Sequence, residues 1–394
     1  MKTSFLISLI GALLFFLSSS TFSEQIPEGP DLDISHCDLE GDYKIIDHIV
    51  KQYNDDLVIE EVFIQELDLE IEQFSFTRLY KKDLKEFKTP IIMRPGSNMN
   101  FDSFLIGENP LAEALANEGH LVYGYNPRPG QIEFMEWFSS HHTESWGMAQ
   151  NVRDMKYLAD VAFCDTEKKP VYLGYSIGAI IGYAVGNAHP NAFSGMILLD
   201  GTLYSTNPEF IENFKASCEE AEDALAHSNY LESATCGVFY ATKKLADLSD
   251  AAFGALYDAL TNPMEGMTPG YTYVTADDPE AKTFKYSSKE NLMTLVENIN
   301  IFQTWAVYRD YRCEISSGER KFTNNLSEFK APLLAVSAEH GFGDYIKEGL
   351  TIWGSDDKTY IKKIGYSHAD LMCAVDQDSA LNNDVLAWLR DRKF

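Results

Sequence analysis

Residues 174–178, Gly-Tyr-Ser-Ile-Gly, constrain the fold of this chain more than any other stretch. They follow a short apolar run, residues 171–173, typical of a buried strand, and they precede residues 179–185, whose apolar character suits a buried helix. A serine at such a sharp strand-to-helix turn has a strained backbone, and glycines on both sides avoid clashes. The helix also directs its free N–H groups and positive dipole end toward the turn. The pattern predicts that Ser176 is a nucleophile.

Strand-like and helical segments alternate along most of the chain, which predicts a mostly parallel sheet flanked by helices. The pattern breaks between Gly201 and Ala331, where the sequence is helical, and then resumes. We therefore expect a sheet domain of residues 24–200 and 332–394, with a helical cap of residues 201–331 inserted between its sixth and seventh strands. The expected strands are 57–67 and 69–80, as an antiparallel pair, then 90–94, 120–125, 171–173, 196–199, 332–337 and 360–364; helices are expected at 43–53, 111–117, 147–163, 249–260, 288–311 and 379–392.

The N-terminal residues 1–23 have the composition of a secretory signal peptide. Lys2 precedes an apolar run, residues 5–17, and small residues follow it, so cleavage is expected near Ser23, with Ser20 as the alternative. The apolar run is short for a membrane span, and no later segment is long and apolar enough for one. A secreted or periplasmic protein is expected. Its formal net charge of -28 argues against nucleic acid and anionic membranes as partners.

All six cysteines lie after the signal segment, which suggests disulfides in an exported protein. A bond between Cys218 and Cys236 is the most local possibility, and free buried cysteines are the alternative. No Cys-x-x-Cys motif or His-Cys cluster indicates a metal site, and no cofactor is expected.

A serine nucleophile needs a base within hydrogen-bond reach, and the base needs an orienting acid. His368 follows the last expected strand and precedes the last helix, where the chain order serine, acid, histidine places the base. His340 is the competitor, but it lies in the loop expected to carry the acid. His141 and His142 are expected on a solvent-facing turn.

Three carboxylates compete for the role of the acid. Asp344 follows a flexible Gly-Phe-Gly segment and is the first choice. Glu339 lies closer to the end of the strand 332–337 and has a longer side chain. Asp200 ends the strand 196–199, where an aspartate is also common as a plain strand-end cap. The sequence leaves these alternatives open, with Asp344 as the preferred acid.

An oxyanion hole requires two backbone N–H groups. One is expected from Ile177, directly after the nucleophile. The second is expected from the loop after strand 90–94, from Ser97 or from Asn98, with Ser97 preferred. Pro95 has no N–H to donate.

These features resemble the α/β-hydrolase superfamily over residues 90–200 and 332–394. Within it, residues 109–128 and 366–371 are similar to the helix, strand and histidine segments of the gastric and lysosomal acid lipases. The resemblance implies an α/β-hydrolase fold with a helical cap, a serine hydrolase and an ester substrate. The chain departs from the pattern in two places: Arg94-Pro95-Gly96-Ser97 replaces the usual His-Gly, and Gly341 stands where these families have an aspartate.

The resulting expectation is an exported serine hydrolase that cleaves small-molecule or lipid esters of carboxylic acids through an acyl-enzyme. One alternative is a serine peptidase of the prolyl-aminopeptidase type, in which the acidic run of residues 219–223 would hold a substrate amine. The other is a non-catalytic binding protein that retains the hydrolase fold. Ester and aminoacyl-amide substrates distinguish the first two functions.

Overall fold

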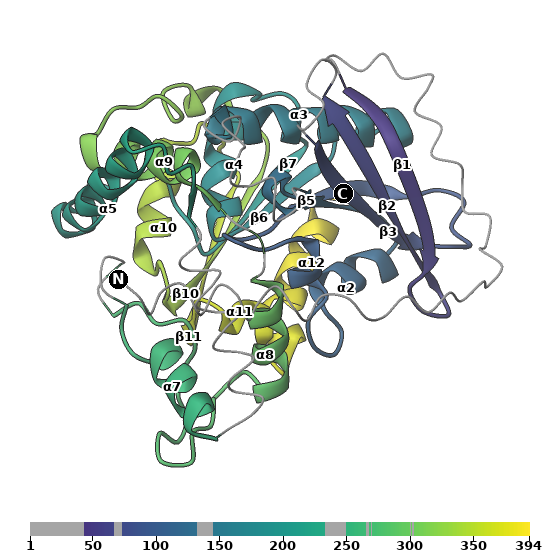
Figure 1. Ribbon diagram of the computed structural model, residues 1–394. Helices are drawn as coiled ribbons and strands as arrows, with labels where there is room; N and C mark the ends of the chain where they lie inside the picture. Colours follow the sequence, from purple (N-terminus) through teal and green to yellow (C-terminus); the bar gives the residue numbers. More distant parts are fainter. Residues whose placement is uncertain are drawn as a thin grey trace.

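A nine-stranded sheet runs through the molecule in the order β1-β2-β3-β5-β4-β6-β7-β10-β11 (Figure 1). The computed structural model describes residues 43–66, 73–131, 145–232, 250–264, 268, 270–299, 301 and 303–394. The strands are β1 (Tyr43–Gln52), β2 (Leu57–Glu66), β3 (Gln73–Lys81), β4 (Lys88–Arg94), β5 (His120–Asn126), β6 (Val171–Tyr175), β7 (Gly195–Leu199), β10 (Leu333–His340) and β11 (Lys358–Ser367).

The sheet is antiparallel at one end and parallel over the rest. Strands β1, β2, β3 and β5 pair antiparallel, whereas β5, β4, β6, β7, β10 and β11 form a continuous parallel ladder. In a parallel ladder the carboxyl ends of neighbouring strands meet at one edge. The loops after β4, β6, β7, β10 and β11 therefore gather at that edge, as the alternating sequence pattern predicted.

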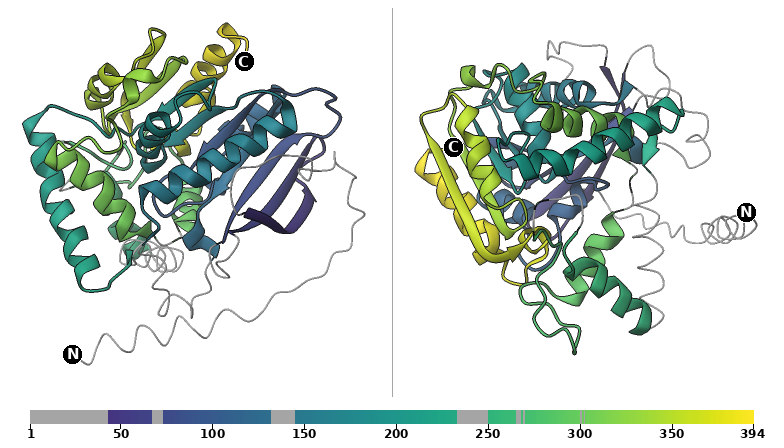
Figure 2. Two further views of the ribbon diagram at one scale, coloured as in Figure 1. Left: turned by 90° about the horizontal axis from the view of Figure 1, so that it is seen from above. Right: turned by 90° about the vertical axis from the view of Figure 1, so that its left-hand side faces the viewer.

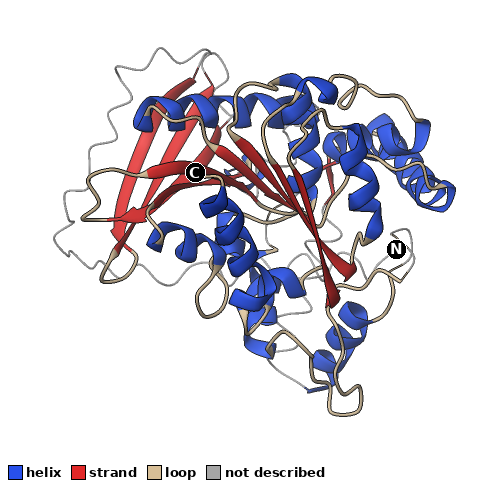
Figure 3. Cartoon of the chain, turned by 180° about the vertical axis from the view of Figure 1, so that it is seen from behind, coloured by secondary structure: helices blue, strands red, loops and turns tan. Residues whose placement is uncertain are grey.

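Helices cover both faces of the sheet (Figure 3). On one face α3 (Met148–Thr166) and α4 (Ile177–Ala188) pack in one apolar cluster. On the other face α2 (Leu111–Asn117), α11 (Asp370–Cys373) and α12 (Asn383–Asp391) pack in a second cluster. Side chains along β4 alternate between the two clusters, because successive residues of a strand point to opposite faces. Shorter helical turns are η1 (Phe101–Phe104), η2 (Arg128–Gln131), η4 (Leu326–Glu328), α10 (Asp344–Gly349), η5 (Leu350–Ile352) and η6 (Asp378–Asn382).

The segment between β7 and β10 contains α5 (Pro208–Ala226), α7 (Asp250–Thr261), α8 (Lys289–Asn298), α9 (Trp305–Ser317) and the two-stranded pair β8 (Leu231–Glu232) and β9 (Gln303–Thr304). We call this segment the insertion. Helices α5 and α9 lie side by side at the end of the molecule far from β1 (Figure 2). A disulfide between Cys218 and Cys313 joins them.

Two expectations about secondary structure were wrong. Residues 43–52 form the edge strand β1 and not a helix, so the insertion falls between the seventh and eighth strands of the sheet. The isoleucine spacing in this segment fits a helix, but β-branched residues also favour strands. Without β1, the side of β2 that faces away from β3 would have unpaired backbone groups along its whole length. The expected helix 288–311 is split into α8 and α9 by β9, which pairs with β8.

The cysteine pairing also differs from the most local possibility. Cys218 is bonded to Cys313, which lies 95 residues away, and Cys236 lies outside the described residues. Cys164 is disulfide-bonded as well, whereas Cys373 is a free buried thiol. Within the described parts of the chain, no helix has both the length and the apolar character that crossing a membrane requires.

Candidate active site

Ser176 stands at the turn between β6 and α4, as the motif predicted. Its φ of 57° and ψ of -120° place a non-glycine residue in a conformation that L side chains rarely adopt. A Cβ on Gly174 would overlap the carbonyl of Gly178, and a Cβ on Gly178 would overlap the carbonyl of Arg94. Both glycines of the motif are therefore required by close backbone packing.

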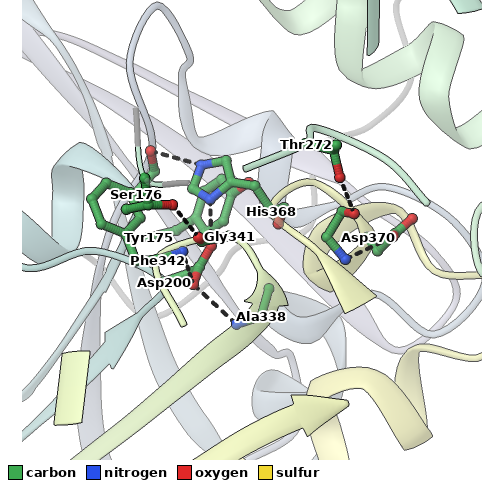
Figure 4. Close-up of polar contacts among 11 residues, drawn as sticks. Tyr175, Ser176, Asp200, Thr272, Ala338, Gly341, Phe342, His368 and Asp370 are labelled. Atoms are coloured by element: carbon green, nitrogen blue, oxygen red, sulfur yellow. Dashed lines mark hydrogen bonds and ion pairs between the residues drawn. The ribbon is translucent and has the colours of Figure 1, made fainter. Parts of the chain in front are cut away.

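His368 lies opposite Ser176, at the carboxyl end of β11. Its Nε2 is 2.9 Å from the Oγ of Ser176 (Figure 4). The histidine is only 2 % exposed, whereas Ser176 is partly exposed. A buried imidazole in hydrogen-bond contact with an accessible serine hydroxyl is the geometry that general-base activation needs.

Asp200 is the carboxylate that contacts His368. Its Oδ2 lies 2.6 Å from the Nδ1 of His368, and its Oδ1 accepts the N–H groups of Ala338 at 3.0 Å and Phe342 at 3.1 Å (Figure 4). Asp200 is fully buried. Both N–H donors come from β10 and the loop that follows it, so this loop holds the carboxylate without supplying one itself.

The expectation that Asp344 contacts the histidine was therefore wrong. Asp344 begins α10 with a side chain that is 73 % exposed and lies 3.2 Å from the Nζ of Lys362. Glu339 accepts the N–H of Gly365 and likewise does not reach His368. Asp200 takes this place instead, and a Cβ on Gly341 would overlap its carboxylate.

Strand order explains why Asp200 can reach the histidine. Strand β7 is the direct neighbour of β6, and Leu199 is in register with Tyr175. The N–H of Ser176 donates to the carbonyl of Leu199 at 2.8 Å, and Gly201 packs on the backbone of Ser176. Asp200, the residue after Leu199, consequently emerges beside Ser176.

Four aromatic rings surround the imidazole of His368. Tyr175 stacks on it at 4.9 Å between ring centroids, and the Tyr175 hydroxyl donates to the His368 carbonyl at 3.2 Å. Tyr271, Tyr273 and Phe342 approach within 5.3, 5.7 and 6.1 Å. Burial raises the pKa of Tyr271 well above 10 and that of Tyr273 to about 12, so both hydroxyls stay neutral. The histidine is thus fixed in orientation by packing as well as by Asp200.

Part of this enclosure comes from the insertion. The backbone of residues 271–273 hydrogen-bonds to the loop of His368: the N–H groups of His368 and Ala369 donate to the carbonyls of Thr272 and Tyr273, respectively. Buried Asp370 accepts bonds from the N–H of Ser367 and from the hydroxyls of Thr275 and Ser287. The loop that carries the histidine is therefore fastened to the insertion.

The loop after β4 lies beside the turn at Ser176. Gly96 packs against the ring of Tyr175, its Cβ position being 3.3 Å from that ring. Ser97 is partly exposed in this loop. Asn98 has a φ of 62° and a buried side chain that donates to the carbonyl of Ile301 in the insertion at 2.9 Å. On the other side of the turn, Ile177 is the first residue of α4, where N–H groups have no partner within the helix.

The other sequence candidates within the described residues do not belong to this group of contacts. His340 is exposed, and His141 and His142 lie outside the described residues. The acidic side chains of residues 219–223 are exposed on α5. Among the described residues, the one group of potential metal ligands is Cys218, Glu222 and Cys313, and its two cysteines are joined as a disulfide.

Sequence reasoning missed the aromatic wall and the anchoring role of the β10 loop. Tyr175 could have been considered, because it occupies the variable position of the motif directly before Ser176. Gly341 carried the second signal: a glycine at the usual place of the acid leaves room for a carboxylate from another strand.

Comparison with known proteins gives the fold of this chain at low sequence identity. No protein-family model and no curated protein sequence matches it. A candidate lipase from Sulfolobus solfataricus superposes with a TM-score of 0.62 at 16 % identity, over 89 % of this chain and 99 % of that protein. An enol-lactonase from Burkholderia xenovorans LB400 has a TM-score of 0.49 at 14 % identity, over 81 % of this chain and 96 % of that protein. Together with the parallel sheet and the turn at Ser176, the first superposition shows that the chain has the α/β-hydrolase fold.

Proposed function

We propose that this protein is an exported serine hydrolase that cleaves carboxylic esters. Ser176 is the nucleophile, His368 is the base and Asp200 is the acid that orients it. The observation that carries the proposal is the continuous chain of contacts from Ser176 Oγ to His368 Nε2 and from His368 Nδ1 to Asp200 Oδ2. Each contact is within hydrogen-bond distance, which is the geometric requirement for a catalytic triad.

In the first half of the reaction, the Oγ of Ser176 attacks the ester carbonyl while His368 Nε2 takes the hydroxyl proton. Asp200 accepts the Nδ1–H of His368 and stabilises the imidazolium that forms. The negative charge on the carbonyl oxygen is stabilised by the N–H groups of Ile177 and Ser97. When the tetrahedral intermediate collapses, the proton passes from Nε2 to the leaving alcohol, and an acyl-enzyme remains on Ser176.

In the second half, water replaces the alcohol. His368 takes one proton from the water as its oxygen attacks the acyl carbonyl, and it returns that proton to Ser176 Oγ when the carboxylic acid leaves. The reaction uses no electron donor or acceptor, and every proton is accounted for by the one histidine.

The insertion supplies the wall over the site and forms the cap of the enzyme, residues 201–331. Residues 271–273 and Ile301 contact the histidine loop and the β4 loop, which supports this role. The disulfide between Cys218 and Cys313 supports an oxidising compartment, consistent with export by a signal peptide of residues 1–23.

The direct test is a panel of 4-nitrophenyl esters with acyl chains of two to sixteen carbons, assayed beside aminoacyl 4-nitroanilides. We expect ester hydrolysis that is abolished in Ser176→Ala. The acyl chain length that is hydrolysed fastest gives the length of acyl group that the site accepts. Faster cleavage of the anilides would replace the ester hydrolase with a peptidase. Equal rates for the wild type and Ser176→Ala would refute both.

A further inference from the structure

One buried arginine has no role in the reaction described above. Arg94 is the last residue of β4 and directly precedes the loop of Pro95, Gly96 and Ser97. Its side chain is fully buried. The sequence at this point also departs from the His-Gly that resembling families have.

Arg94 differs from the other almost fully buried arginines, Arg78 and Arg128, in the groups that its guanidinium contacts. Arg78 lies 2.6 Å from Glu60 and 2.9 Å from Asp165, and Arg128 lies 2.7 Å from Asp154. By contrast, no carboxylate of the described residues comes within 4 Å of the Arg94 guanidinium; burial lowers its pKa from the ordinary arginine value. Burying a cation without an ion pair is costly, so a purely structural explanation is weak.

The Arg94 guanidinium turns back onto the loop that follows it. Nη1 donates to the carbonyl of Pro95 at 2.7 Å, and Nη2 donates to Oδ1 of Asn151 at 3.0 Å. Asn151 is itself held by its amide, which donates to the carbonyl of Gly147 at the start of α3. The guanidinium also lies over the ring of Tyr125 at 4.9 Å. The side chain is therefore fixed from two sides, and one of its hydrogen bonds is made to the loop itself.

This hydrogen bond sets the direction of the first N–H group in the loop, that of Gly96. The peptide unit between Pro95 and Gly96 is planar and trans, so the N–H of Gly96 points opposite to the Pro95 carbonyl and away from the guanidinium. Gly96 in turn packs on the ring of Tyr175, the residue before the nucleophile. The backbone of Arg94 and Pro95 also packs directly on Gly178 in the first turn of α4. Fixing the Pro95 carbonyl thus fixes the start of the loop relative to Ser176.

We propose that Arg94 is a positioning residue of the oxyanion hole: its hydrogen bond to the Pro95 carbonyl holds the β4 loop so that the N–H of Ser97 faces the developing oxyanion. The inference rests on the proposed ester hydrolysis. Because the oxyanion forms only on the way to the transition state, loss of Arg94 lowers kcat and leaves substrate binding nearly unchanged.

The test compares Arg94→Lys and Arg94→Met with Arg78→Lys as the matched control. The control makes the same change at a buried arginine on β3, a strand separated from β4 by β5. The guanidinium of Arg78 pairs with Glu60 and Asp165. For each variant, kcat, KM, the inhibition constant of an arylboronic acid and the unfolding temperature are measured. The boronic acid forms a tetrahedral adduct on the serine and therefore reports on the oxyanion hole.

For Arg94→Lys we expect kcat to fall about tenfold to a hundredfold with KM within about twofold, because a misdirected oxyanion donor acts mainly on the transition state. The affinity for the boronic acid should fall by the same factor as kcat/KM. Arg78→Lys should lose unfolding temperature but keep kcat and boronic acid affinity. If Arg94→Met does not fold, Asn151→Ala replaces it and should reduce kcat in the same direction by a smaller factor.

The inference is overturned if folded Arg94→Lys keeps both kcat and boronic acid affinity within twofold of the wild type. It is also overturned if its loss matches that of Arg78→Lys at an equal loss of unfolding temperature. These outcomes require an active wild type, so they refute the role of Arg94 alone. An inactive wild type refutes the proposed ester hydrolysis, and the inference falls with it.

Discussion

Two neighbouring loops approach His368, and one supplies a hydrogen-bond acceptor while the other supplies donors to it. The loop after β7 supplies the carboxylate of Asp200, and the loop after β10 supplies the N–H groups of Phe342 and, from the strand end, Ala338 that bind this carboxylate. The strands β7 and β10 are adjacent in the sheet, so a carboxylate from either one can reach the same point. The comparison teaches that one loop supplies the carboxylate beside His368 while the neighbouring loop supplies the N–H groups that hold it in place.

The largest effect is expected from removing the carboxylate itself. Asp200→Ala leaves His368 without the acceptor of its Nδ1–H, and we expect kcat to fall about 1,000-fold to 10,000-fold, by analogy with the loss of the acid in other serine triads. Asp344→Ala and Glu339→Ala are the controls on the β10 side and should keep kcat within about twofold, since neither contacts the histidine. A larger loss in Asp344→Ala than in Asp200→Ala would reverse the assignment.

The next effect tests the space between the two loops. In Gly341→Ala the added Cβ overlaps the Asp200 carboxylate, and we expect kcat to fall about tenfold to a hundredfold as the acid is displaced. Gly254→Ala in α7 is the matched control, because a Cβ there meets nothing within 4 Å. Should both variants show wild-type kcat, Gly341 would have no part in seating the acid.

A smaller gain is expected from moving the acid to the other loop. The double variant Asp200→Ala/Gly341→Asp places a carboxylate on the β10 side in the space that the first substitution vacates. We expect kcat to recover at least about tenfold over Asp200→Ala, because the histidine regains an acceptor for its Nδ1–H. No gain in a folded double variant would argue that the two positions do not share this space.

The smallest effect concerns stability and involves Asp370, the second buried carboxylate beside His368. Burial raises its pKa above the unfolded value of 3.8. Since the folded protein binds this proton more tightly than the unfolded chain, the associated stability is complete below pH of about 3.8 and is lost as pH rises through the raised pKa. Asp370→Asn lacks this titration. The unfolding temperature of the wild type should therefore rise relative to that of the variant as the pH is lowered. A difference that stays constant or shrinks toward low pH would contradict this account.

The positions of Ser176 and His368 could be predicted from the sequence because their signals are local. Gly174, Ser176 and Gly178 are required by one turn, and the strand and helix beside them are apolar runs. His368 follows the last strand of the sheet, so chain order alone places it. The parallel part of the sheet was predictable for the same reason, since each strand and helix has its own pattern.

The carboxylate partner of His368 and the edge strand could not be predicted in this way because they depend on distant segments. Asp200 is selected over Asp344 by the register of β7 beside β6 and by the space at Gly341, which are properties of the assembled sheet. The residues of β1 become a strand because β2 offers an open edge. Cys218 pairs with Cys313 because α5 and α9 are packed together.

The central claim is that Ser176, activated by His368 and Asp200, is the nucleophile of this protein. The most direct measurement is labelling of the folded protein with a fluorophosphonate, followed by intact mass and peptide mapping. We predict a single adduct on Ser176, strongly slowed in Asp200→Ala and absent in Ser176→Ala. A folded wild-type protein that forms no adduct, or an adduct that persists in Ser176→Ala, would contradict the claim.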